Sequence, residues 1–436
     1  MRIELNHGLD IRLPGAPMQR VDGTVETSHV AILPADYRGL RPALVVESGE
    51  RVAAGQRVLN DRRVPAIACT SPVSGIVTSI ERGNKRQVQQ IVIERDGTSE
   101  VSYRSYSADA VRNVSADDIR QTLLASGLWL SLRARPYDRA ASPDVMPRAL
   151  LVTAIDTNPL APDPAVMLHD NADAFVTGVA VLARLCTGTT FVCVAAGTSI
   201  PVPEREHIRR AELAGPHPAG LPGTHIHALG LEVRREADLW HAGYQDVVDV
   251  GHLFLTGRVP ARRVIAVSGP CARRPRLVST LPGADLGDFA DEWSEPDGKL
   301  VSGSLLAGRG PARFLGRFDN KVTMLPSAGL VDYRRKSLPA RLAALLRGTN
   351  GKEAVSLFGS AGGMLPSESF EGIWPFHVPP MPLLRALLSE DTEQAELLGC
   401  LGLAEEDLAL CTYVCAGRNN YGAALRAALN TIERDG

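Results

Sequence analysis

Three histidines lie within eleven residues of one stretch of the 436-residue chain that is rich in glycine and proline. The stretch, residues 215–227, reads GPHPAGLPGTHIH and contains His217, His225 and His227. If its second half is a strand, His225 and His227 point to the same face, because side chains alternate along a strand. Such a pair could ligate a metal ion or contact a ligand oxygen. The alternative is a loop whose histidines are hydrogen-bonded at a domain seam, and no acidic residue stands at a spacing that would complete a metal site.

Three of the seven cysteines, Cys400, Cys411 and Cys415, lie near the end of the chain. Cys411 and Cys415 are four residues apart and would share one face of a helix. An iron–sulfur cluster normally takes four thiolates at closer spacing, so these intervals favour buried cysteines that pack small helices. A site with two or three thiolate ligands remains the alternative. An odd, scattered set of cysteines indicates a reducing compartment rather than a disulfide framework.

A module in residues 41–83 looks like a cofactor carrier that has lost its attachment point. Short β-rich runs broken by Gly and Pro are typical of a compact barrel or sandwich. The phrases VESGERVAAGQRVL and TSPVSG resemble the biotinyl/lipoyl carriers, which are barrel-sandwich hybrids. Those carriers hold their cofactor on a lysine in a hairpin, but the corresponding residues 60–65 read NDRRVP. Arginine cannot replace lysine because a guanidinium stays protonated. We therefore expect the carrier fold without the carried group.

The elements that position these residues alternate between strands and helices from residue 148 onward. We predict strands at 149–155 and 190–195 and helices at 165–186, 204–213 and 244–255, which implies a parallel, Rossmann-like layer. Ligands of such sheets usually lie beyond the carboxyl ends of the strands. The loops at 156–164 and 197–203 occupy those positions. Neither loop reads G-x-G-x-x-G, and the chain has no G-x-x-x-x-G-K-[ST] motif, so the sequence does not support nucleotide binding through a standard phosphate loop.

The fold class we predict is a multidomain α/β protein. A helix at 117–132, with Asp117 as its N-cap, opens the α/β region. The predicted boundaries are 1–100 for the barrel-sandwich hybrid, 101–258 for the Rossmann-like domain, 259–330 for a β-grasp domain of the soluble-ligand-binding type, 331–380 for an irregular linker and 381–436 for a C-terminal helical domain.

Charge and hydropathy exclude some classes of function. The net charge of −2 gives no overall bias toward nucleic acid. The N-terminus shows no basic head followed by an apolar core, so no export segment is visible. The apolar run at 175–197 is long enough to cross a membrane, but Arg184 lies near its centre and TGTT interrupts it. We interpret the run as a helix leading into a buried strand, so the protein should be soluble or peripheral to a membrane.

Taken in order, these segments resemble the A subunits of the sodium-translocating NADH:quinone reductases. The matching phrases run almost from end to end, and residues 334–370 match least. The phrases are GLDIRLPGAP, TSPVSG, IERGNKR, TAIDTNP, GPHPAGLPGTHIH, GYQDVVDVGHLFLTG and LGCLGLAEEDLALCTYVCAGRNNYG.

The resemblance implies a peripheral subunit on the cytoplasmic face of a bacterial inner membrane, without a transmembrane helix. It implies other subunits of the complex as partners, above all the membrane flavin subunit, and no nucleic acid. NADH, flavins and iron centres would belong to those partners, and this chain would bind no redox centre or covalent cofactor. Ubiquinone is the implied ligand, for which His217, Thr224, His225 and His227 are candidate contacts. Because no membrane path is visible, sodium export would lie in the partners. The alternative is a non-catalytic scaffold that docks redox subunits and binds no small molecule.

Overall fold

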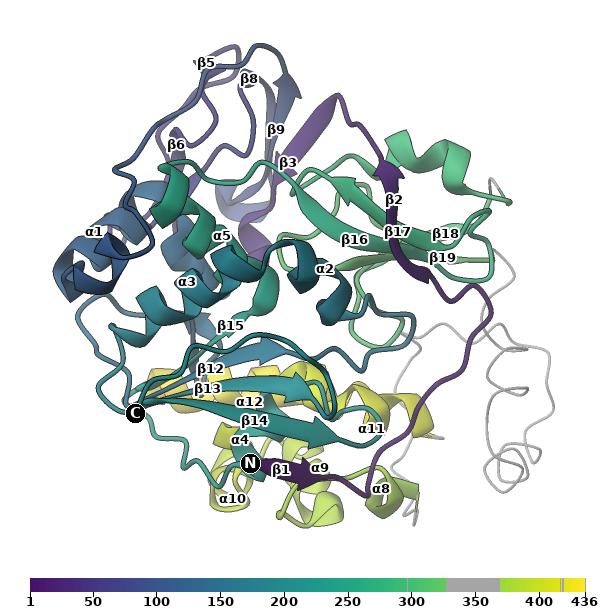
Figure 1. The fold of residues 1–436 in the computed structure, drawn as a ribbon. Helices are drawn as coiled ribbons and strands as arrows, with labels where there is room; N and C mark the ends of the chain where they lie inside the picture. The colour runs from purple at the N-terminus through teal and green to yellow at the C-terminus, as the bar shows by residue number, and fades with distance from the viewer. Residues whose placement is uncertain (296, 327–368, 416, 418, 436) are drawn as a thin grey trace.

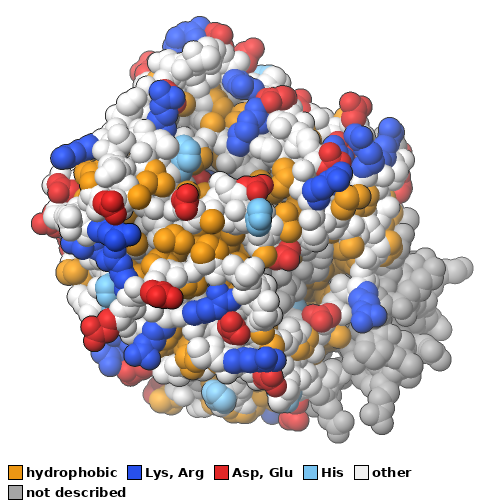
Figure 2. Space-filling model, in the orientation of Figure 1, with side chains coloured by type: hydrophobic (Ala, Val, Ile, Leu, Met, Phe, Trp, Pro, Cys, Tyr) orange, Lys and Arg blue, Asp and Glu red, His pale blue; other side chains and the backbone are white. Residues whose placement is uncertain are grey.

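The computed structural model describes residues 1–295, 297–326, 369–415, 417 and 419–435, and Figure 1 shows their arrangement. Most of the predicted linker at 331–380 lies outside these residues. In the face shown in Figure 2, basic and acidic side chains are interspersed, which agrees with a net charge near zero.

The N-terminal module consists of two small antiparallel sheets with the orders β3-β9-β8-β5 and β4-β6-β7. Val58 and Leu59 from one sheet and Val77 and Ile93 from the other belong to one buried core. The turn that lacks a lysine joins β6 to β7. The elements are β3 (His29–Ile32), η1 (Pro34–Asp36), β4 (Pro42–Leu44), β5 (Arg51–Val52), β6 (Arg57–Asp61), β7 (Ala68–Thr70), β8 (Gly75–Arg82), η2 (Asn84–Arg86) and β9 (Val88–Arg95).

The first two strands of the chain pair with strands outside this module. Strand β1 (Arg2–Glu4) lies parallel to β14, and β2 (Met18–Thr24) lies parallel to β17. In Figure 1 the purple N-terminal segment therefore runs past the lower sheet before it reaches the upper right one. The N-terminal segment thus adds an edge strand to two other sheets.

The largest sheet has seven strands in the order β1-β14-β13-β12-β15-β10-β11. The strands from β1 to β15 are parallel, and β10 and β11 are antiparallel. The chain runs outward from β12 to β13 and β14 and then returns to β15 on the other side of β12, so the strand order reverses between β12 and β15. The strands are β10 (Arg133–Arg135), β11 (Arg139–Ala140), β12 (Ala149–Ala154), β13 (Thr189–Ala195), β14 (Ile208–Ala214) and β15 (Leu239–Gly243).

The helix predicted at 204–213 is wrong, because these residues lead into and form most of strand β14. Its buried positions, Ile208, Ala211 and Leu213, face the sheet core, while Arg209 is exposed. Arg, Ala, Glu and Leu all favour helices in isolation, but pairing with β13 and β1 outweighs that preference.

The predicted strand through His225 and His227 is also wrong, because both belong to helix α4 (Pro222–Ala228). Pro222 suits the first turn of a helix, where a missing N–H costs nothing.

Two predicted helices change in extent. The N-cap of α1 (Ala116–Ser126) is Ser115 rather than Asp117, and this helix ends at Gly127, which adopts φ 78°. The helix predicted at 165–186 divides into α2 (Pro164–Asp170) and α3 (Ala172–Ala183).

Helices α3 and α5 (Tyr244–Thr256) pack at close range, and the prediction for α5 is confirmed to within one residue. A Cβ atom on Gly251 would lie 1.7 Å from the carbonyl oxygen of Ala174, and one on Gly178 would lie 1.9 Å from that of Val247. Only glycine allows the two backbones to come this close. The apolar run at 175–197 thus becomes α3 and the buried strand β13, as predicted. Among the described residues, no helix combines the length and apolar character needed to cross a membrane.

A mixed sheet with the order β18-β19-β16-β17-β2 follows α5. Its core contains Ile265, Val278 and Phe289. The remaining elements of the first 326 residues are η3 (Ala110–Asn113), η4 (Leu128–Ser131), β16 (Arg263–Ser268), β17 (Arg276–Thr280), η5 (Leu286–Glu292), β18 (Lys299–Ser302) and β19 (Lys321–Leu325).

The C-terminal region is helical, as predicted, and has a core of its own that includes Leu383, Cys400 and Leu425. In Figure 1 these helices lie beneath the large sheet. They are α8 (Ser369–Gly372), α9 (Pro380–Leu388), α10 (Thr392–Leu397), η6 (Cys400–Gly402), η7 (Glu405–Leu408), α11 (Ala409–Val414) and α12 (Tyr421–Asp435).

Candidate functional site

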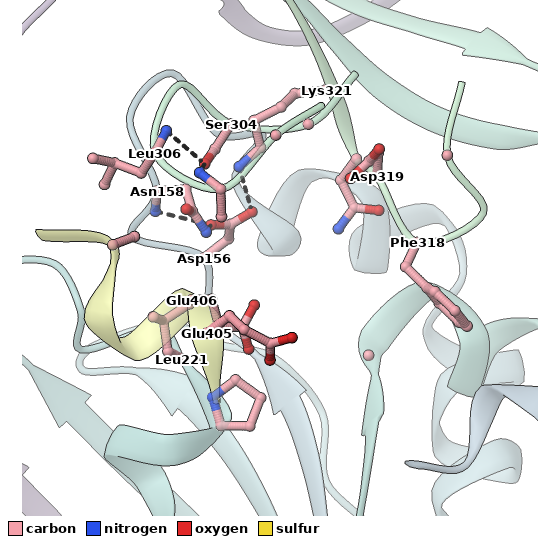
Figure 3. Close-up of a pocket in the computed structure, with 18 of the residues that line it drawn as sticks. Asp156, Asn158, Leu221, Ser304, Leu306, Phe318, Asp319, Lys321, Glu405 and Glu406 are labelled. Carbon is pink, nitrogen blue, oxygen red and sulfur yellow. Dashed lines mark hydrogen bonds and ion pairs between the residues drawn. The ribbon is translucent and has the colours of Figure 1, made fainter. Parts of the chain in front are cut away.

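A cleft of about 540 Å³, which we call the central cleft, lies where the strand order of the large sheet reverses. Thr153 and Asp156 at the end of β12 line it together with Gly243 at the end of β15. The loop 303–309 and residues 316–321 come from the mixed sheet, and η7 comes from the C-terminal helices. Figure 3 shows these segments converging on the cleft. Of the two predicted ligand loops, the first contributes Asp156 and Asn158, and no residue of 197–203 lines the cleft.

A buried ion pair closes one wall of the central cleft (Figure 3). Lys321 Nζ lies 2.9 Å from Asp156 Oδ2, and the two side chains are 4% and 12% exposed. Asp156 also accepts hydrogen bonds from the backbone and side-chain amides of Asn158. Burial alone would raise the pKa of Asp156, but Lys321 and Asn158 outweigh it and hold that pKa below its ordinary value. Asp156 therefore stays ionised, and the pair joins the mixed sheet to the large sheet.

A second cluster of charged side chains joins the N-terminal module and the C-terminal helices to the large sheet. The carboxylate of Asp138 contacts Arg38, Arg133 and the Nε2 atom of His241, the last at 2.7 Å. Arg38 also lies 3.2 Å from Glu405, which accepts two hydrogen bonds from Arg426. Burial alone would raise the pKa of Asp138, but Arg133 and His241 help to hold it well below its usual range. The walls of the cleft are thus connected by ion pairs between domains.

A second cavity of about 110 Å³, which we call the small cavity, lies between the N-terminal module, α5 and the mixed sheet. Asp36 and Arg317 line both cavities, so these two residues stand in the wall between them. The apolar lining residues of the small cavity include Ile32, Leu33, Pro72, Val101, Leu128, Val259 and Pro282.

Two aspartates on α5 differ in their ionic partners at this wall. Asp246 Oδ1 accepts hydrogen bonds from Arg263 at 2.8 Å and from Arg317 at 2.9 Å. Asp249 lines the small cavity and is 8% exposed, and its nearest cation, Arg317, lies 4.0 Å away. Within the described residues, no hydrogen bond reaches the carboxyl group of Asp249. Burial raises its pKa to about 7, and the attraction of Arg263 and Arg317 does not offset this.

The predicted quinone contacts lie in or beside α4, and none of them lines either cavity, although Gly220, Leu221 and Pro222 of the same stretch line the central cleft. His225 is fully buried and its Nε2 atom donates to the Ala219 carbonyl at 2.9 Å. His217 is 1% exposed and its Nδ1 atom lies 3.2 Å from Thr157 Oγ1. Thr224 is equally buried, and His227 packs against Phe376. Burial lowers the pKa values of His217, His225 and His227 to about 4, so all three are neutral at pH 7.

The three C-terminal cysteines are buried within the helical core. The sulfur of Cys415 lies 3.4 Å from the hydroxyl of Tyr421, and burial raises the pKa of Cys400 to about 12. Cys411 is 1% exposed. In the described part of the chain, no three His, Cys, Asp or Glu side chains are grouped so that they could hold a metal ion.

Sequence reasoning missed Asp246, Asp249 and Lys321. A signal for the first two was present, because YQDVVDVG places two acids three residues apart in an otherwise apolar helix. Such residues are rarely buried without a partner. Lys321 gave no comparable signal, since its partner Asp156 lies 165 residues earlier in the chain.

The domains found here match three family models in the order in which they occur along the chain. Residues 3–96 match the NqrA N-terminal barrel-sandwich hybrid domain, and residues 114–259 match the NqrA second alpha/beta domain. Residues 264–311 match the NQRA C-terminal domain. The fold is therefore that of a multidomain NqrA-type protein.

Full-length relatives identify the family. The chain is 40% identical over 447 residues to the A subunit of the Na(+)-translocating NADH-quinone reductase of Pseudomonas aeruginosa (strain UCBPP-PA14), with 100% of both chains covered. It is 39% identical to the A subunits of Cellvibrio japonicus and Pasteurella multocida, again with 100% of each chain covered. The chain belongs to the family of Na(+)-translocating NADH-quinone reductase A subunits.

Among solved structures, an NAD+-reducing nickel–iron hydrogenase in its H2-reduced state gives a TM-score of 0.41 at 15% identity. The match covers 75% of this chain and 63% of the hydrogenase chain. This likeness is too distant to support an argument about the site.

Proposed function

We propose that this chain is a peripheral subunit of a sodium-translocating NADH:ubiquinone reductase on the cytoplasmic face of a bacterial inner membrane. In this proposal it contributes to ubiquinone binding, while partner subunits hold the flavins and iron centres, bind NADH and export sodium. The observation that carries the proposal is the similarity to the A subunits, which covers both chains in full. The membrane flavin subunit is the partner that we expect to contact it. The α/β region is proposed to be Rossmann-like and the mixed sheet to be a β-grasp domain.

The small cavity supports a quinone headgroup better than the residues around α4 do. A quinone site needs an apolar slot and one or two donors directed at the carbonyl oxygens. The small cavity combines apolar side chains with the carboxyl groups of Asp36, Glu100 and Asp249 and with Arg317, whereas His217, Thr224, His225 and His227 line neither cavity.

One observation favours the alternative, a scaffold that docks redox subunits. The basic side chains of the central cleft are engaged by acids within the chain, as in the pairs Lys321–Asp156, Arg263–Asp246 and Arg309–Asp36. Ion pairs across the cleft hold the N-terminal module, the large sheet, the mixed sheet and the C-terminal helices in fixed positions. Together these regions would present fixed surfaces to partners.

A reconstitution experiment tests the proposed function. Complex prepared without this chain should lose NADH-driven ubiquinone reduction and sodium uptake, and adding the purified chain should restore both. Titration of the purified chain with ubiquinone-1, followed by tryptophan fluorescence, then separates the two roles. Saturable binding supports the quinone role, and restoration without binding supports the scaffold.

A further inference from the structure

A buried carboxyl group that receives no hydrogen bond from any described residue, on the wall of a cavity, is an unusual arrangement. Burying an ionised carboxylate costs much free energy unless it is paired, and the uncharged acid is preferred where pairing fails. Asp249 meets this condition, since it is 8% exposed and no described residue donates a hydrogen bond to it. Its proton is therefore free to be donated to whatever occupies the small cavity.

The surroundings of Asp249 explain why the nearby arginines do not neutralise it. Arg263 and Arg317 both donate to Asp246, which lies three residues earlier on α5. Arg317 is further held by Ser131, whose hydroxyl oxygen lies 3.4 Å from its Nη2 atom. The guanidinium groups are thus directed at Asp246, and Asp249 faces the cavity with a cation no nearer than 4.0 Å.

The other titratable groups around the small cavity are arranged differently. Asp36 accepts from Arg309 and from the backbone N–H of Arg317. Burial raises the pKa values of Tyr37 and Cys69 well above neutral pH, so both are uncharged there. Glu100 lines the cavity but is exposed and pairs with Arg258 at 2.9 Å.

We infer that Asp249 binds a quinone headgroup in the small cavity by donating its carboxyl proton as a hydrogen bond to a carbonyl oxygen. The inference rests on the proposed function and adds the site and the recognising group. The ligand class comes from the proposed function, and the cavity is compatible with it. Apolar side chains line the cavity beside charged ones such as Asp36, Glu100 and Arg317, and the acid supplies one donor to an acceptor oxygen. The volume of about 110 Å³ is too small for a nucleotide.

Titration of the full chain with ubiquinone-1 at pH 6 and at pH 8 provides the test. Wild type should bind about tenfold more weakly at pH 8, because the fraction of the acid form falls by that factor across a pKa near 7. Asp249→Asn keeps an N–H donor and cannot ionise, so its affinity should be equal at the two pH values. Asp249→Ala should bind about three- to tenfold more weakly than wild type at pH 6, the loss expected for one hydrogen bond.

Glu100→Gln is the matched control, since it changes another acid at the same cavity and should retain the pH dependence of wild type. If wild type binds ubiquinone-1 equally at both pH values, or if Asp249→Ala binds as wild type does, the role of Asp249 is refuted while the proposed function stands. If wild type does not bind at either pH, both the inference and the quinone role fall.

Discussion

Asp246 and Asp249 lie three residues apart on α5, yet Arg263 and Arg317 both donate hydrogen bonds to Asp246 and neither donates one to Asp249. Both residues are more than nine-tenths buried. Their pKa values consequently move in opposite directions, below the ordinary value for Asp246 and up to about 7 for Asp249. Two similar acids on one helix therefore have separate roles, one in holding domains together and the other facing a cavity.

Replacing Asp246 should be far more damaging than replacing Asp249. Asp246→Asn leaves the buried Arg263 without its carboxylate and weakens the hold on Arg317, which we expect to cost about 3–5 kcal/mol of unfolding free energy. Asp249→Asn removes no hydrogen bond among the described residues and should be neutral or stabilising. Urea unfolding at pH 7.5 compares the two variants. A smaller loss for Asp246→Asn than for Asp249→Asn would contradict the assigned partners.

Stability should depend on pH through Asp249. Its pKa is about 7 in the folded chain, whereas an unfolded aspartate titrates near ~3.9. Between these values the folded state binds more protons, so the contribution of Asp249 to stability falls as pH rises and levels off above pH 7. The difference in melting temperature between Asp249→Asn and wild type should therefore grow from pH 5 to pH 7.5 and then stay constant. If the difference in melting temperature became smaller as pH rises, the pKa of Asp249 would be lower in the folded chain than in the unfolded chain, and the assignment would be wrong.

The Lys321–Asp156 pair should behave as a coupled unit. Lys321→Met leaves Asp156 buried without its cation, and we expect a loss of about 3–5 kcal/mol. Adding Asp156→Asn to this variant should recover a large part of the loss, because no uncompensated charge remains. Unfolding of the two single variants and the double variant gives the coupling energy. Strictly additive losses would show that the pair is not formed in solution.

The contact between α3 and α5 should tolerate no added methyl group. Gly251→Ala places a Cβ atom on the Ala174 carbonyl oxygen and must push the two helices apart, so its melting temperature should fall by several degrees. Gly372→Ala is the control, because no described atom lies within 4 Å of the added Cβ atom. Equal melting temperatures for the two variants would mean that the helices do not pack closely.

Local patterns predicted much of the fold, and long-range pairing accounts for the main errors. The turns of the N-terminal module, the extent of α5 and the helical C-terminal region follow from glycine punctuation and apolar periodicity. By contrast, 208–214 has the composition of a helix and becomes a strand because β1 and β13 lie on either side of it. The stretch around His225 drew attention through residue type and loop position, and these do not show which side chains reach a cavity.

The central cleft was predictable as a location but not as a set of residues. Placing ligands beyond the ends of parallel strands pointed to two loops, of which the one that starts at Asp156 lines the central cleft and 197–203 does not. The partner of Asp156 comes from a different sheet, and Arg38 and Glu405 come from opposite ends of the chain. Such contacts depend on how domains pack, for which spacing within one segment carries no information.

The pairing of β1 and β2 with distant strands bears on how the chain is made. Arg2 pairs with Glu212, and Met18 pairs with Arg276. On the ribosome, therefore, β1 and β2 must wait until more than 200 further residues have been synthesised before they find their partners. The N-terminal module can fold early from local contacts, whereas completion of the two larger sheets comes late and closes long loops, which is intrinsically slow. A truncation of the first 24 residues would thus leave that module intact and expose one edge on each of the other two sheets.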